Sequence, residues 1–466
     1  MNVRSLLALL LVLPAAAAIA QDDGGGDPGG PAAGVLIDPA GAFVTRYDRA
    51  LGTAADRARR EALAASALPA DLNRPSEVRK VSLRKLEAAI AGRLAAGEEP
   101  DDAQRHLAGL TRVDYLFVVP TSDAGPGDVI LAGPAGGFAA DAVGRVVEHT
   151  TGRPVLRLAD LLAVVRADPG AQIGCSIDPV PERQRAMARA VASAGPLRSA
   201  GEARAVYGKL AEILGDQTVR VSGVPPGSAA AVAMVEADYR MKLVALGLEP
   251  STVRGLPSHL STIRPGANSA QRWWFVPAYD PVVVNADRTA FALSGPRVRL
   301  LTQDEVIGAG GGKRDAGFAS ASNAAWANRF SEKVPELAAA RPVFAALQNV
   351  VDLAVVAELV RSENLAARTG WAAELLRDDD ALPTPGGNAP RTVRTAFNTK
   401  RAGRAGVIGL VGGGVTVRAA DALRAAGTAP DAAGTLSAAR SAALALPSPD
   451  AAGDAPADAA ARWWWD

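Results

Sequence analysis

The feature that most constrains the fold is the segment of residues 229–246, near the middle of the chain. Residues 225–227 are Pro-Pro-Gly and interrupt the backbone just before this segment, and Ser228 can cap a helix that begins after them. Nothing inside the segment opposes helix formation. We therefore predict a helix here, and its charged residues restrict how it can pack.

The predicted helix carries two ion pairs on opposite sides. Glu236 stands four residues before Arg240, and this acid-first order favours an ion pair along a helix. Asp238 stands before Lys242 in the same way. At about 100° per residue the two pairs lie roughly 160° to 200° apart around the helix. We expect one pair to face protein rather than water, with structural ion pairs in the central helix of the main domain.

Strand and helix signals alternate along the chain, which predicts a mixed α+β or α/β fold with helices packed on mixed sheets. The expected strands are residues 34–38 and 42–45, as a hairpin, then 112–119, 128–132, 172–177 and 217–223. The expected helices are 47–65, 81–96, 158–167, 181–192, 203–214, 322–330 and 342–363. Residues 272–301 predict a β-meander, and 407–411 with 415–417 predict a last hairpin around the glycines at 412–414.

The first twenty residues have the pattern of a secretory signal peptide. Arg4 is followed by an apolar run, and Ala18-Ile19-Ala20 has the A-x-A pattern of a cleavage site. We expect cleavage near Ala20 and a protein exported to the periplasm or the cell surface. The apolar run at 342–360 contains Asn349, Asp352 and a further carboxylate, so we expect a buried helix in a soluble protein and no transmembrane segment.

Changes in composition and stretches rich in proline and glycine divide the chain into the parts that we expect. These are a signal peptide (1–20), a flexible linker (21–31), an N-terminal α/β domain (32–198), a region with the central helix, the meander and further helices (199–376), a linker (377–400), a small C-terminal α/β segment (401–447), and a disordered tail ending in a tryptophan cluster (448–466).

Charge and cysteine content restrict the partners and the covalent chemistry. The 50 Lys and Arg residues stand against 49 Asp and Glu residues, so the basic excess typical of a nucleic-acid binder is missing and we expect no nucleic-acid partner. Cys175 is the one cysteine, so no disulfide can form within the chain. Stability must therefore come from packing.

Several blocks of sequence, taken together and in order, resemble an uncharacterised family of secreted planctomycete proteins, known only as a domain of unknown function. The blocks are residues 34–38 (GVLID), 128–135 (DVILAGPA), 151–155 (TGRPV), 174–179 (GCSIDP), 236–242 (EADYRMK) and 352–357 (DLAVVA). The resemblance covers roughly residues 32–361. It implies an exported protein but no activity, because the family has none assigned.

Two sets of residues could carry catalysis. Cys175 with His149 and Asp178 is a conceivable thiol nucleophile set, but a position inside a strand predicts a small buried hydrophobe instead. Asp38, Asp178 and Asp280 follow apolar strands and could share a cation or act as acid and base if those strand ends converge. As turn formers they need no such role.

Motifs for metals and cofactors are incomplete. His106, His149 and His259 lack metal-ligand spacing, so we expect no metal site. Residues 308–314 (GAGGGKR) lack the spacing of a phosphate-binding loop, and 409–414 lack the glycine order of a dinucleotide site. We expect no cofactor.

The tryptophan cluster at the end of the sequence, Trp463, Trp464 and Trp465, should not remain exposed. It can dock on this chain or bind a partner, such as an unknown envelope protein or polymer.

Our leading hypothesis is a non-catalytic binding or scaffolding module of the cell envelope. The alternative is a hydrolase-type enzyme that uses strand-end carboxylates or Cys175, which would require a deep pocket where several of these side chains converge.

Overall fold

The structure is a computed structural model that describes residues 35–37, 42–45, 52–123, 125–193, 199–263, 270–307, 313–315, 317, 319–385, 390–402, 405–445 and 462–466. The predicted signal peptide, the linker at 21–31, Asp38, most of the glycine loop at 308–314 and most of the predicted tail lie outside these residues.

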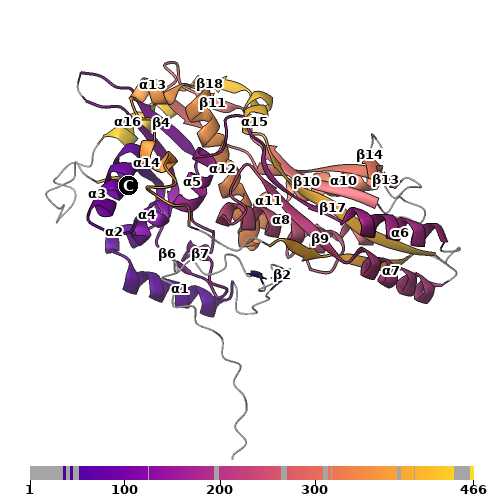
Figure 1. Cartoon of the computed structure of the whole chain (residues 1–466). Coiled ribbons are helices and arrows are strands. Elements are labelled where there is room, and N and C mark those ends of the chain that lie inside the picture. Colours follow the sequence, from indigo (N-terminus) through magenta and orange to yellow (C-terminus); the bar gives the residue numbers. More distant parts are fainter. Residues whose placement is uncertain are drawn as a thin grey trace, which may run out of the picture.

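The larger sheet among these residues has ten strands and mixed pairing (Figure 1). Its order is β1–β2–β15–β9–β8–β17–β10–β13–β14, and β16 pairs with β17. Most neighbours are antiparallel, whereas β10 runs parallel to β17 and β15 parallel to β2. The strands are β1 (Val35–Ile37), β2 (Ala42–Thr45), β8 (Ile173–Asp178), β9 (Asp216–Ser222), β10 (Ala270–Ala278), β13 (Arg297–Ile307), β14 (Lys313–Asp315), β15 (Thr392–Arg394), β16 (Phe397–Ala402) and β17 (Ala405–Val417).

The second sheet has seven strands in the order β18–β11–β12–β4–β5–β3–β19. These are β3 (Ser76–Ser82), β4 (Tyr115–Val119), β5 (Asp128–Ala135), β11 (Val282–Val284), β12 (Ala290–Ala292), β18 (Thr428–Pro430) and β19 (Trp464–Trp465). A small separate pair consists of β6 (Phe138–Ala140) and β7 (Val146–Glu148).

The helices pack around and between these sheets, which confirms the predicted α+β class. They are α1 (Ala54–Ala67), α2 (Ala70–Asn73), α3 (Leu83–Ala95), α4 (Asp102–Arg105), α5 (Leu158–Val165), α6 (Pro181–Ser193), α7 (Ala200–Leu214), α8 (Ala229–Ala245), α9 (His259–Thr262), α10 (Ala321–Glu332), α11 (Val334–Ala340), α12 (Pro342–Ser362), α13 (Leu365–Thr369), α14 (Glu374–Arg377), α15 (Ala419–Ala426) and α16 (Thr435–Leu444).

Helix α8 is the central helix that the sequence predicts. The Ser228 side chain accepts a hydrogen bond from the Ala231 N–H, as a cap should. The helix packs on β8 and β17 on one side and on α5 and α12 on another, so both ion pairs are buried, not one. The four charged side chains of α8 can be buried only because each of them has a partner of opposite charge.

Helix α12 lies near the middle of the molecule beside α8 (Figure 1). Among the described residues it is the helix long and apolar enough to cross a membrane, but 83% of its apolar stretch is buried inside the protein. The prediction of a buried helix here is confirmed.

The predicted hairpin around the glycines at 412–414 is wrong, because one continuous strand, β17, runs through them. A Cβ atom on Gly413 would lie 2.3 Å from the Trp273 carbonyl oxygen and 2.7 Å from Asp238 Oδ1. A Cβ on Gly414 would lie 2.2 Å from the Cys175 carbonyl oxygen. These glycines therefore allow close packing of β17 against its neighbours and make no turn.

The region predicted as a meander contains four strands that belong to two sheets. The outer strands, β10 and β13, pair with each other in the ten-stranded sheet. The inner strands, β11 and β12, pair with each other and continue the seven-stranded sheet through β18 and β4. Pro281 has no N–H to donate and follows β10, so the chain leaves the first sheet there.

The two sheets also join segments that the sequence assigns to different parts of the chain. The ten-stranded sheet places β8, β17 and β10 side by side, and these come from the regions 32–198, 401–447 and 199–376. The division of the chain into domains stays a prediction.

A substitution in β17 tests the close packing of α8 on the sheet. We expect Gly413→Ala to lower the free energy of unfolding by at least about 2 kcal/mol, because the added methyl group meets main-chain atoms and the carboxylate of Asp238. The measurement is urea unfolding. As a control, Gly92→Ala in α3 adds a methyl group into open space and should raise stability by about 0.5–1 kcal/mol. A neutral effect of Gly413→Ala would contradict this packing.

Candidate functional site

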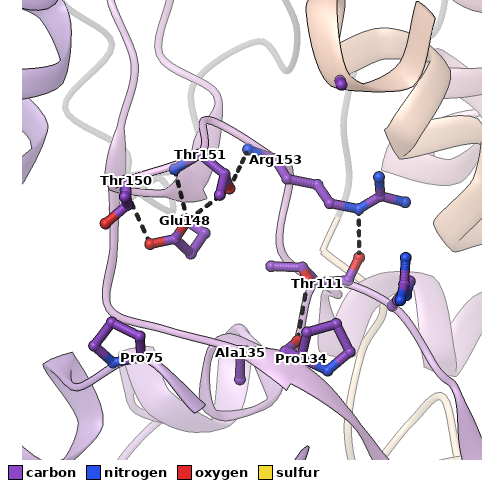
Figure 2. A pocket seen from close by; sticks show the side chains of 10 residues that line it. Pro75, Thr111, Pro134, Ala135, Glu148, Thr150, Thr151 and Arg153 are labelled. Atoms are coloured by element: carbon purple, nitrogen blue, oxygen red, sulfur yellow. Dashed lines mark hydrogen bonds between the residues drawn. The ribbon is translucent and has the colours of Figure 1, made fainter. Parts of the chain in front are cut away.

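A surface cavity of about 450 Å³ lies where the loop after β7 faces the segment that leads into β4 (Figure 2). The lining residues come from the end of β7 and the loop after it, from the residue before β3, from the segment before β4, from the end of β5 and from α11. They are Pro75, Thr111, Arg112, Pro134, Ala135, Glu148, Thr150, Thr151, Arg153 and Ala339. The cavity therefore combines two arginines with an apolar wall of proline and alanine.

Glu148 shapes one wall of the cavity. Its carboxylate accepts hydrogen bonds from the N–H of Thr150 at 2.9 Å and from the N–H and hydroxyl of Thr151 at 2.7 and 2.6 Å. Gly152 follows with a φ of +73°, which lets the loop turn back. The Glu148 carboxylate is thus engaged in holding its own loop.

Arg153 is the charged group that distinguishes the cavity. Its Nε donates to the Thr111 carbonyl at 3.4 Å, and its Nη2 donates to the Gln348 amide oxygen at 2.8 Å. Figure 2 shows this side chain extending away from Glu148. Both acceptors are neutral, and within the described part of the chain Arg153 forms no ion pair.

Burial, together with the positive charges of Arg112 and Arg297, lowers the pKa of Arg153 to about 10, and the nearby carboxylates of Asp352 and Asp114 oppose this shift. Asp114 pairs with Arg112 and with Arg297, each at 2.8 Å. Asp352 pairs with Arg297 at 3.0 Å. On this side of the cavity three arginines therefore share two carboxylates, and Arg153 is the one left without a direct anionic partner.

The predicted thiol set is not assembled. Cys175 lies buried in β8, and burial followed by the charge of Asp238 raises the pKa of its thiol. His149 lies in the loop after β7, where its ring contacts the Thr150 hydroxyl at 3.1 Å. Asp178 accepts a hydrogen bond from Ser176, and in a regular strand its side chain is on the face opposite Cys175. In the described residues no hydrogen bond links these three side chains.

The strand-end carboxylates occupy separate local contacts. Asp178 lies 3.6 Å from Arg220, and Asp280 accepts a hydrogen bond from the Ser294 hydroxyl at 3.3 Å. The third, Asp38, is outside the described residues. Over the part of the chain that the structure covers, no three His, Cys, Asp or Glu side chains gather as a metal-ligand set.

The two ion pairs of α8 form as predicted. Lys242 lies 2.7 Å from Asp238, and Arg240 lies 3.5 Å from Glu236. Arg145 reaches Glu236 from another segment at 3.9 Å. Burial raises the pKa of Glu236 to about 7, although Arg145 and Arg240 oppose this shift. These ion pairs are buried inside the protein, so we interpret them as structural contacts of α8.

Of the two alternatives for the tryptophan cluster, the structure shows docking on this chain. Trp464 and Trp465 form β19, which pairs with β3 at one edge of the seven-stranded sheet. Asp466 binds Arg79, which is fully buried, at 2.7 Å. The sequence gives no local signal for Arg79, whereas Arg153 falls within the TGRPV block.

The raised pKa of Glu236 predicts a pH dependence of stability. The folded-state pKa of about 7 lies above the ordinary value of 4.5, so the folded protein retains a proton that the unfolded chain loses. Stability present below pH 4.5 is therefore lost as the pH rises toward 7. We expect the free energy of unfolding, relative to that of Glu236→Gln, to fall by roughly 3 kcal/mol between pH 4.5 and pH 8.

Urea unfolding of both proteins at each pH measures this difference. Burial lowers the pKa of His259 to about 4, which acts in the opposite direction between pH 4 and pH 6.5. That contribution is common to both proteins and cancels in the comparison. Parallel pH profiles would contradict the assignment to Glu236.

The ion pair between Arg79 and Asp466 joins two residues that are far apart in the sequence, and removing its carboxylate should lower the stability of the fold. We expect Asp466→Asn to lower the free energy of unfolding by about 1–3 kcal/mol, because the buried guanidinium loses its carboxylate. Thermal and urea unfolding check this. The control is Asp421→Asn, which breaks an exposed pair with Arg424 and should cost less than about 0.5 kcal/mol. Equal decreases in the free energy of unfolding for the two substitutions would refute the stabilising role of the Arg79–Asp466 pair.

Comparison with known proteins places one domain within the chain. A domain described as a protein of unknown function (DUF1598) is found at residues 175–259, from β8 through α8 to the first residue of α9. It includes the EADYRMK block and most of the GCSIDP block. No curated protein and no solved structure matches the chain. The planctomycete lineage and the secretion implied by the resemblance stay predictions.

Proposed function

We propose that this chain is a non-catalytic binding module of the periplasm or cell surface, and that its cavity binds an anionic ligand that carries a carboxylate or a phosphate group. The observation that carries the proposal is Arg153, which lines the cavity. Within the described part of the chain its guanidinium donates only to neutral oxygens. A partly buried charge that lacks a direct ion pair is costly, and a bound anion would lower that cost.

The chemistry of arginine supports this choice of ligand. A guanidinium is planar and presents several donors, so it binds carboxylate and phosphate groups through two parallel hydrogen bonds. Arg112 lines the same cavity and adds a second guanidinium, which is paired with Asp114. The apolar wall, which includes Pro75, Pro134 and Ala339, fits a ligand with a non-polar portion next to its anionic group.

The placement of Cys175 supports a binding role over the hydrolase alternative. A nucleophilic cysteine needs a lowered pKa and a neighbouring base. Burial acts in the other direction on the pKa of Cys175, and His149 bonds to Thr150 instead. An exported location rests on the signal-peptide pattern of the first twenty residues.

Calorimetric titration with inorganic phosphate and with benzoate, a carboxylate next to a non-polar ring, tests the proposal. We expect saturable binding of at least one of these anions by the native chain, and at least about tenfold weaker binding by Arg153→Gln, because the charged partner of the anion is lost. Arg153→Lys should be intermediate, since it keeps the charge but loses the planar donor pair.

The matched control is Arg57→Gln, which removes an exposed arginine of α1 that pairs with Glu61. Circular dichroism should show that all three variants are folded. Binding that is equal in the native chain, Arg153→Gln and the control would refute the cavity as the anion site.

A further inference from the structure

Residues 462–466 lie on the protein as a peptide ligand lies on a sheet edge. Trp464 pairs with Val81 and Trp465 with Lys80, in an antiparallel ladder with β3. The N–H of Ser82 donates to the Trp463 carbonyl at 2.8 Å and extends this ladder. Addition of a strand to a sheet edge is a recurrent mode of peptide recognition.

Side chains add sequence selectivity to the ladder. The guanidinium carbon of Arg79 lies 4.6 Å from the centre of the Trp464 ring, and that of Arg462 lies 4.1 Å from it. The Trp465 Nε1 donates to the carbonyl of Ala443 in α16 at 2.9 Å. Trp464 is 8% exposed. A different residue order would lose these contacts.

Hydrogen bonds to the main chain position the Arg79 guanidinium to bind a carboxylate. Its guanidinium donates to the main-chain carbonyls of Leu72, Ala108 and Arg74 at 3.0, 2.8 and 2.9 Å. These bonds hold the side chain in place, but the acceptors are neutral. Asp466 supplies the negative charge through two hydrogen bonds of 2.7 and 3.0 Å.

We propose that the sheet edge at β3, with Arg79 and the end of α16 beside it, is a peptide-recognition site that also accepts residues 462–466 from a second copy of the chain. This surface is matched to the sequence of residues 462–466, so an identical segment from another copy meets the same partners. Residues 446–461 separate the segment from α16, and a chain of that length can span roughly 50 Å when extended. Exchange of such a terminal element between identical copies is a low-cost route to a dimer.

The first test keeps the protein folded before the segment is released. A protease recognition sequence is inserted within residues 446–461, the protein is purified folded and then cut, and a fluorescent peptide of sequence Ala-Arg-Trp-Trp-Trp-Asp is added. We expect the labelled peptide to replace the cut segment, as seen by fluorescence anisotropy. The peptide carrying the Asp466→Asn change should bind at least about tenfold more weakly, and a scrambled peptide should not bind.

The second test addresses the second copy. Light scattering of the uncut chain at rising concentration should show a dimer, and a chain that ends at residue 461 should remain monomeric, because exchange requires residues 462–466. Three results overturn the recognition site: the cut protein unfolds when the segment leaves, the peptide does not enter, or the scrambled peptide binds equally. Peptide exchange without any dimer overturns the second copy as occupant.

Discussion

The ion pair between Asp238 and Lys242, buried between α8 and the ten-stranded sheet, is the interaction on which the rest of the structure depends. Two charges at this depth are tolerated because they lie 2.7 Å apart, and because Gly413 leaves space beside them. A side chain on Gly413 would push β17 away from β10 and from α8 together. The charge pair and the glycine therefore hold the sheet and its central helix in one arrangement.

Three arginines, two of them buried and one partly buried, obtain their hydrogen-bond partners in three different ways. Arg297 pairs with two carboxylates that the fold brings to it, Asp114 and Asp352. Arg79 obtains its carboxylate from residue 466, far along the chain. Arg153 has neutral acceptors, and it lines the cavity. In this series the arginine without an ion pair is also the one that lines the cavity, and for this reason we propose a ligand site there.

Local signals predicted what local physics controls. The cap at Ser228 and the four-residue spacing of Glu236 and Arg240 predicted α8 and its pairs, because both contacts form within one or two turns. The glycines at 412–414 were interpreted as a turn, since glycine favours turns wherever no neighbour is known. Their role in β17 depends on Trp273 and Cys175, which no local pattern connects to them.

The sequence by itself determined the mixed fold class, the helix at 229–246 with its ion pairs, and the burial of Cys175, since periodicity, capping and residue type act over a few residues. Only the tertiary structure decided that the strands of 272–301 divide between two sheets, that Trp464 docks on β3, and that Arg153 meets Thr111 and Gln348 beside a cavity. Pairing partners and buried charges depend on segments distant in sequence, and those distances close only when the chain packs.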